Sequence, residues 1–241
     1  MRSVPGAGPG ASSGAEASTI NRVRRVLAIK PFRRLWGVTY LCSVADWLNI
    51  LALTGLATKL TDNYFAQNFA FVGVVLTGLA PGLLFAPIGG LLADRFDRRK
   101  VMVVADLLRC GFLLSIAIVS APWWLLAGNF LVGCASSMWI PSKEAAVPNL
   151  LRRPDQVETA NQLGMVMTYG LAVITAAGAN AVITGVNTTF HLFPGDPSLN
   201  IAKLVVIITG LLYLASAILI ATRIPELSLR NVHATPEQKV K

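Results

Sequence analysis

The sequence predicts an all-α integral membrane protein with six transmembrane helices, and two observations lead to that fold class. Hydrophobic residues make up 54% of the 241 residues and charged residues only 14%, and the mean hydropathy is +0.60. Soluble domains carry about 25% charged residues, so this composition argues against a soluble or a disordered protein. The second observation is a series of six apolar stretches, each close to the roughly 20 residues with which a helix crosses a bilayer.

The predicted spans can be placed one after another. The first contains a single charge, Asp46, the second contains none, and the third contains Asp106 and Arg109. Pro122 separates the third span from the fourth, because proline is favoured at the first position of a helix. The spans are about 35–58, 66–93, 101–120, 123–146, 158–185 and 201–222. They form a bundle over residues 31–226, preceded by a flexible basic tail (1–30) and followed by a cytoplasmic tail or the start of a central loop (227–241).

The basic residues predict the orientation. With the N-terminus in the cytoplasm, every Lys and Arg lies on the cytoplasmic side except Lys59 and Lys203 on the outer side and Arg109 within a span. Cytoplasmic loops of membrane proteins are enriched in such residues. We therefore expect a multi-pass protein of the cell inner (plasma) membrane with both termini in the cytoplasm. The net charge of +9 then reflects topology, and no nucleic acid partner is expected.

A short turn between the second and third spans carries the most specific motif. Residues 89–100 read GGLLADRFDRRK and resemble the signature loop of the major facilitator superfamily, G-x-L-A-D-[RK]-x-[GD]-R-[RK]-[RK]. The matching residues singled out here are Gly90, Asp94, Arg95, Arg98 and Arg99. The resemblance implies that this loop is a cytoplasmic gate in which the aspartate faces a helix of a second half. The alternative is a basic turn that only fixes the topology.

Other stretches are similar to the branch of the superfamily that contains siderophore and macrolide exporters. They are PFRRLW at 31–36, ADWL at 45–48, WIPSKEAAVP at 139–148 and ETAN at 158–161. One stretch departs from the pattern: Asn129 begins NFLVG, where many drug–proton antiporters have an arginine in R-F-L-x-G. This departure weakens a direct transfer of the antiport mechanism.

The resemblance implies a function for the chain. Superfamily members have twelve spans in two six-helix halves, with the substrate between them, and this chain holds one such half. The expected function is transport of a small molecule, as proton-coupled efflux by alternating access, with a second six-helix half on the same or another chain. The alternative is a truncated or non-transporting membrane fragment or scaffold that needs a second half.

Ionisable residues inside the spans are the candidate site residues. Asp46 lies near the middle of the first span, where a carboxylate is costly and is functional by default. It is the candidate proton carrier, and Asn49 and Trp47 beside it are transport candidates; the alternative is that Arg109 neutralises Asp46 structurally. Asp106 and Arg109 are three residues apart on one helix, so we expect a structural ion pair near the cytoplasmic third of the third span.

No catalytic, cofactor or metal site is expected. The sequence shows no nucleophile–base pair and no phosphate-binding loop, so an enzyme is disfavoured. Cys42, Cys110 and Cys134 lie in apolar segments without metal-ligand spacing. The expected partners are the lipid bilayer, a small-molecule substrate and the second half.

Overall fold

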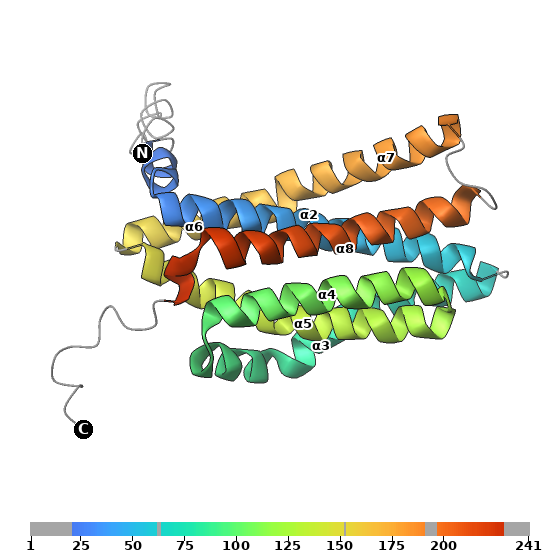
Figure 1. Ribbon diagram of the computed structural model, residues 1–241, viewed down its shortest axis with the longest axis horizontal. Helices are drawn as coiled ribbons and strands as arrows, with labels where there is room; N and C mark the ends of the chain where they lie inside the picture. Colours follow the sequence, from blue (N-terminus) through green and yellow to red (C-terminus); the bar gives the residue numbers. More distant parts are fainter. Residues whose placement is uncertain (1–20, 62–63, 152, 191–196, 229–241) are drawn as a thin grey trace, which may run out of the picture.

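The computed structural model describes residues 21–61, 64–151, 153–190 and 197–228, and these are helical almost throughout (Figure 1). The elements are α2 (Lys30–Lys59), α3 (Tyr64–Arg95), α4 (Arg98–Val119), α5 (Pro122–Leu150), α6 (Pro154–Val166), the π-helical segment η1 (Met167–Leu171), α7 (Ala172–Phe190), α8 (Pro197–Arg223) and the 3₁₀ turn η2 (Pro225–Ser228). The described part contains six helices long and apolar enough to cross a membrane, with α6, η1 and α7 joined as one. The predicted all-α fold with six membrane-length helices is confirmed.

The break between α4 and α5 has the cause that the sequence indicates. Ser120 ends α4 in the left-handed conformation, with φ of 49°, and its amide donates to the carbonyl of Ile116. Pro122 then begins α5 as the first helical residue, a position where its missing N–H costs nothing. At the other end of α4, the Asp97 carboxylate caps the helix by accepting from the amide of Arg99, at 3.0 Å.

The N-terminal region differs from the flexible tail expected over residues 1–30. Residues 21–27 are helical, and Val26 is buried in a small cluster with Phe32, Leu151 and Ala160. The physical reason is this apolar contact, which holds the segment against the start of α2 and the end of α5. Residues 1–20 of the expected tail, and 229–241 of the C-terminal tail, lie outside the described residues.

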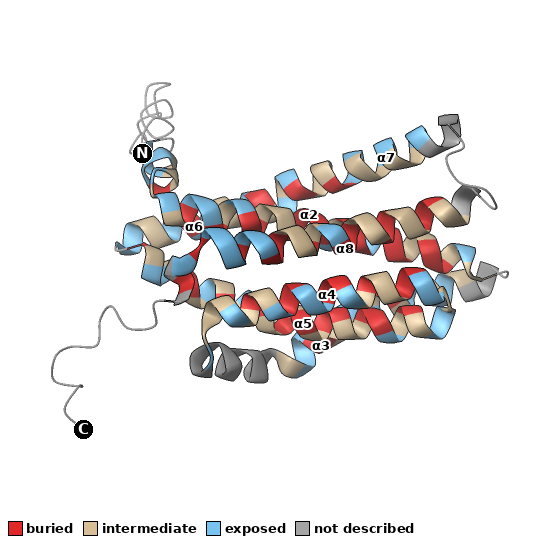
Figure 2. Ribbon diagram, in the orientation of Figure 1, coloured by how far each residue is buried: buried red, intermediate tan, exposed pale blue. Residues whose placement is uncertain are grey.

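The helices form a bundle with a shared central layer. Helix α4 packs on α5 and α8, α2 packs on α8 and α7, and α3 packs mainly on α5 (Figure 1). Figure 2 shows that the buried residues concentrate on the facing sides of α2, α4, α5 and α8. Many large apolar side chains point outward, among them Phe69, Leu79, Leu83, Ile118 and Ile174. This pattern is the one expected when lipid rather than water covers the outside.

Helices α3 and α5 approach each other closely at a glycine contact. A Cβ atom on Gly133 would lie 2.8 Å from Cγ of Pro81 and 3.0 Å from the backbone oxygen of Gly78. Both distances are shorter than van der Waals contact, so only glycine permits this spacing. Small residues at helix contacts give membrane helices the close packing that the hydrophobic effect cannot supply inside lipid.

We expect Gly133→Ala to destabilise the protein by about 1–3 kcal/mol, because the new methyl group forces α3 and α5 apart. Gly111→Ala is the matched control, since a Cβ there meets nothing within 4 Å and alanine is the better helix former. Thermal unfolding of the two detergent-solubilised variants, followed by tryptophan fluorescence, measures the difference. Equal or higher stability of Gly133→Ala would contradict the close-contact explanation.

Candidate functional site

A polar network lies at mid-height between α2, α4 and α8. Its centre is Arg109 of α4, whose side chain is only 1% exposed. The Nη1 atom of Arg109 lies 3.3 Å from a carboxylate oxygen of Asp106, which is fully buried. The expected ion pair between Asp106 and Arg109 is therefore present, in the middle part of α4. A charge inside a membrane is costly unless it is paired, so this pair allows Arg109 to be buried.

Two aromatic rings complete the surroundings of Arg109. Its Cζ atom lies 5.1 Å from the ring centroid of Tyr213 in α8 and 5.4 Å from that of Trp139 in α5. Aromatic faces attract a desolvated guanidinium through their quadrupole. The cation is thus held by one carboxylate on its own helix and by rings from two neighbouring helices.

Asp106 has its own partners on α8 and α2. The Ser216 hydroxyl donates to its second carboxylate oxygen at 2.5 Å, and the Cys42 thiol lies 3.8 Å from the same oxygen. Cys42 and Ser216 also contact each other, with Sγ and Oγ 3.0 Å apart. Asp106 therefore joins three helices, α2, α4 and α8, through a single carboxylate.

Asp46 lies in the middle of α2 and is reachable from outside the bundle, since its side chain is exposed. Its Oδ1 atom accepts a hydrogen bond of 2.6 Å from the hydroxyl of Tyr213, whose ring contacts Arg109. Tyr213 therefore connects the exposed carboxylate with the buried cation. Among the described residues, Arg109 forms its ion pair with Asp106, and Asp46 is linked to Arg109 through Tyr213.

Asn49 and Trp47 point away from Asp46. Asn49 is buried and donates to the side-chain oxygen of Asn129 at 3.4 Å. The indole N–H of Trp47 donates to the backbone oxygen of Thr168 in η1, at 2.8 Å. The two residues next to Asp46 in the candidate group therefore contact α5 and the π-helical segment, and Asp46 shares its network with Tyr213 instead.

Asn129 has a structural role in the packing of α3 on α5. Its amide nitrogen donates to the backbone oxygen of Val74 at 2.8 Å and to the Thr77 hydroxyl at 2.9 Å. It also accepts the hydrogen bond from Asn49. Asn129 therefore connects α2, α3 and α5 through uncharged hydrogen bonds, at the position of the arginine in the R-F-L-x-G pattern.

The arginines after the short turn contact helices of the same bundle. Arg98 donates to the backbone oxygen of Ala145 in α5 at 2.8 Å. Arg99 donates to the oxygens of Ile220, at 3.4 Å, and Ala221 at the end of α8. These carbonyls lie in the last turns of their helices, where cationic donors are favourable. Gly90, Asp94 and Arg95 belong to the final turns of α3, and their side chains lie outside the described residues.

The chain matches a known family over most of this bundle. Residues 25–192 fit the family described as "transmembrane secretion effector", a family of the major facilitator superfamily, and the match covers more than half of the chain. The chain belongs to this family. It is therefore a multi-pass membrane protein of a transporter family, not of an enzyme family.

Curated relatives in the major facilitator superfamily agree. The chain is 32% identical over 108 residues to an uncharacterised MFS-type transporter of Bacillus subtilis, YfiS, covering 45% of this chain and 25% of the relative. It is 32% identical over 108 residues to the multidrug resistance protein MdtH of Salmonella typhimurium (42% and 27% covered). It is 31% identical over 111 residues to MdtG of Salmonella arizonae (45% and 27% covered). The matched part spans about a quarter of these relatives' length.

Sequence reasoning missed Tyr213, Ser216 and Cys42 as members of the network. The signal that could have found the first two is their spacing in the otherwise apolar sixth span, where Thr209, Tyr213 and Ser216 recur at i, i+4 and i+7. That spacing places them on one face of a helix. All three are fully buried.

We expect Asp106→Asn to destabilise the chain by about 3–5 kcal/mol, because it leaves Arg109 buried without its paired carboxylate. Adding Arg109→Met should restore most of that loss, since the charge is then removed together with its partner. Thermal unfolding of the wild type, both single variants and the double variant gives the coupling. Additive losses in the double variant would contradict an interaction between the two side chains.

Proposed function

We propose that this bundle lines one side of a small-molecule transport pathway and that Asp46 carries the coupling proton. The observation that carries the proposal is an exposed carboxylate half-way along a membrane-length helix. A carboxylate facing lipid at that depth is strongly unfavourable, and such residues face a water-filled cavity or another protein segment. We therefore place Asp46 against a water-filled cavity or a second protein segment, and not against the acyl chains.

The neighbours of Asp46 support a role in proton uptake and release. When Asp46 is ionised, the Tyr213 hydroxyl donates a charge-assisted hydrogen bond to it. Protonation of Asp46 makes it a weaker acceptor and loosens this link between α2 and α8. Because the Tyr213 ring also covers Arg109, the change reaches α4. One proton on an exposed site thus alters contacts among three packed helices, as alternating access requires.

Efflux is the proposed direction. The description of the family, "transmembrane secretion effector", names secretion. Two of the relatives are named multidrug resistance proteins. Alternating access in the superfamily is a rocking of two bundles around a central site. We propose that the face carrying Asp46 meets a second six-helix bundle, on the same or another chain, and that the substrate lies between them. Asp94, at the end of α3, stays a candidate for the cytoplasmic gate.

In the proposed orientation both termini of the chain lie on the cytoplasmic side of the inner (plasma) membrane. The start of α2, the start of α4 and the end of α8 lie together at one end of the bundle, because arginines at these positions contact one another's helices and α5. The arginines at this end are Arg33, Arg34, Arg98, Arg99 and Arg223. The positive-inside rule assigns that end to the cytoplasm.

Asp46→Asn should abolish proton-driven efflux while leaving the fold intact, because asparagine keeps the hydrogen bond to Tyr213 but cannot exchange a proton. The assay is ethidium efflux from energised cells that lack other multidrug exporters. The variant is expressed together with the second six-helix bundle from its own host. Asp155→Asn is the matched control, because Asp155 is also exposed but lies in the first turn of α6.

The result expected is background efflux for Asp46→Asn and wild-type efflux for Asp155→Asn. Full proton-driven efflux by Asp46→Asn would rule out the proton-carrier role. No efflux by the wild type would favour a non-transporting membrane scaffold.

Single cysteines should report the orientation. Lys59 and Lys100 are both exposed and lie at opposite ends of the bundle. A membrane-impermeant maleimide should label Lys59→Cys in intact cells and Lys100→Cys only after permeabilisation. The wild type, which retains Cys42, Cys110 and Cys134, provides the background. The reverse labelling pattern would overturn the proposed orientation.

A further inference from the structure

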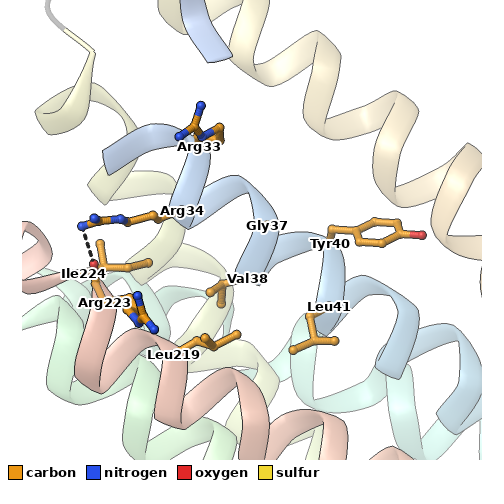
Figure 3. A pocket seen from close by; sticks show the side chains of 9 residues that line it. All are labelled: Arg33, Arg34, Gly37, Val38, Tyr40, Leu41, Leu219, Arg223 and Ile224. Carbon is orange, nitrogen blue, oxygen red and sulfur yellow. Dashed lines mark hydrogen bonds between the residues drawn. The ribbon is translucent and has the colours of Figure 1, made fainter. Parts of the chain in front are cut away.

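A cavity opens between α2 and α8 at the arginine-rich end of the bundle, and Asp46 is not among the residues that line it. Its volume is about 430 Å³. Its rim carries Arg33, Arg34 and Arg223, and its walls include Val38, Leu41 and Leu219. Figure 3 shows Arg34 reaching from α2 to the last turn of α8, with Leu41 and Leu219 on opposite walls.

We propose that this cavity binds the headgroup and upper acyl chain of an anionic phospholipid. The binding does not depend on the transport proposed above, because it requires only that the bundle sits in a bilayer. The site is defined by three features that occur together: cationic groups at the rim, an apolar floor, and an open space made by a glycine.

The rim has the charge that a lipid phosphate needs. None of the residues that line the cavity is acidic. Among the described residues, none forms a hydrogen bond or ion pair with the guanidinium group of Arg33 or Arg223, and both side chains are exposed. Arginine presents a planar fork of donors that fits phosphate oxygens. Basic pockets between membrane helices on the cytoplasmic side bind anionic headgroups for this reason.

Arg34 has a separate role that shapes the site. Its Nη1 atom donates to the backbone oxygen of Arg223, at 2.9 Å (Figure 3). This bond satisfies a carbonyl at the end of α8 and fixes the distance between the two helices. Arg34 therefore holds the rim together, and Arg33 and Arg223 are the residues assigned to the phosphate.

The polarity of the cavity changes along the helices in the direction that a lipid requires. On α2, Arg34, Val38 and Leu41 follow one another at i, i+4 and i+7, so they occupy successive turns on one side of the helix. On α8, Leu219 lies one turn deeper than Arg223. The charged rim thus gives way to an apolar channel within two turns. A soluble anion would use the rim alone, whereas a phospholipid uses both parts.

Gly37 provides the space between rim and floor. It is exposed in the cavity, and a Cβ atom there would meet nothing within 4 Å. No close helix contact therefore explains the absence of a side chain at this position. A larger side chain would extend from this open position into the space proposed for the lipid, which makes Gly37 a sharp test.

The test is native mass spectrometry of the chain in mild detergent with added dioleoylphosphatidylglycerol or, in parallel, dioleoylphosphatidylcholine, which has the same acyl chains. We expect one phosphatidylglycerol to remain bound at activation energies that strip phosphatidylcholine. The double variant Arg33→Gln, Arg223→Gln should lower this occupancy by about fivefold for each arginine removed, and replacement of both by lysine should restore part of it. Arg34 is left unchanged in every variant.

Gly37→Leu should lower phosphatidylglycerol occupancy as strongly as the double arginine variant, although it retains every charge. Gly55→Leu is the matched control: it lies on the same helix, and a Cβ there also meets nothing within 4 Å. Thermal unfolding of each variant identifies any that fails to fold, in which case the arginine variants decide the question.

Three outcomes would overturn the proposal. Equal retention of the two lipids would show that the arginines do not select the headgroup. Unchanged occupancy in Gly37→Leu would place the lipid elsewhere on the basic end. Displacement of phosphatidylglycerol by millimolar inorganic phosphate would mark a site for soluble anions, because phosphate lacks the chain that the apolar floor holds.

Discussion

The buried guanidinium of Arg109 sets the constraint on which the rest of the bundle depends. A cation in the membrane interior must be surrounded by compensating groups, and here they come from different helices. Asp106 supplies the carboxylate, Trp139 and Tyr213 supply ring faces, and Ser216 holds the carboxylate in place. Since lipid tails provide no hydrophobic force between helices, such polar contacts fix the rotation of α8 on α4 more firmly than apolar packing alone.

Much of the fold could be predicted because hydropathy and span length are properties of local sequence. The ion pair between Asp106 and Arg109 was equally local, since two residues three apart on a helix must be neighbours. Asn49 was harder. It lies three residues from Asp46, about 60° around α2, yet that rotation separates an exposed carboxylate from a buried amide. Which of the two side chains faces inward depends on how α2 packs on its neighbours, and the local sequence pattern does not determine that packing.

The contacts of Tyr213 and Cys42 could not be predicted for the same reason. Each joins α2 to helices far along the chain, so its partner is decided only when the bundle assembles. Residues 21–27 illustrate the opposite error. Their basic composition suggested a flexible tail, but Val26 is buried in an apolar cluster with Phe32 and Leu151, and Leu27 packs against the same cluster. The average composition of a segment does not indicate which of its side chains becomes buried.

Within the described part of the chain, the π-helical segment Met167–Leu171 interrupts the fifth span alone. Its wider turn adds a residue and so rotates α7 by about 100° relative to an uninterrupted helix. At this point Trp47 holds the backbone oxygen of Thr168, and the Thr168 and Ser43 hydroxyls are 3.1 Å apart. The fifth span therefore consists of two α-helical segments joined by a π-helical turn that is hydrogen-bonded to α2. The π-helical turn therefore sets the direction in which α7 leaves α6, and the hydrogen bond between Tyr40 and Thr175, at 2.7 Å, holds the start of α7 on α2.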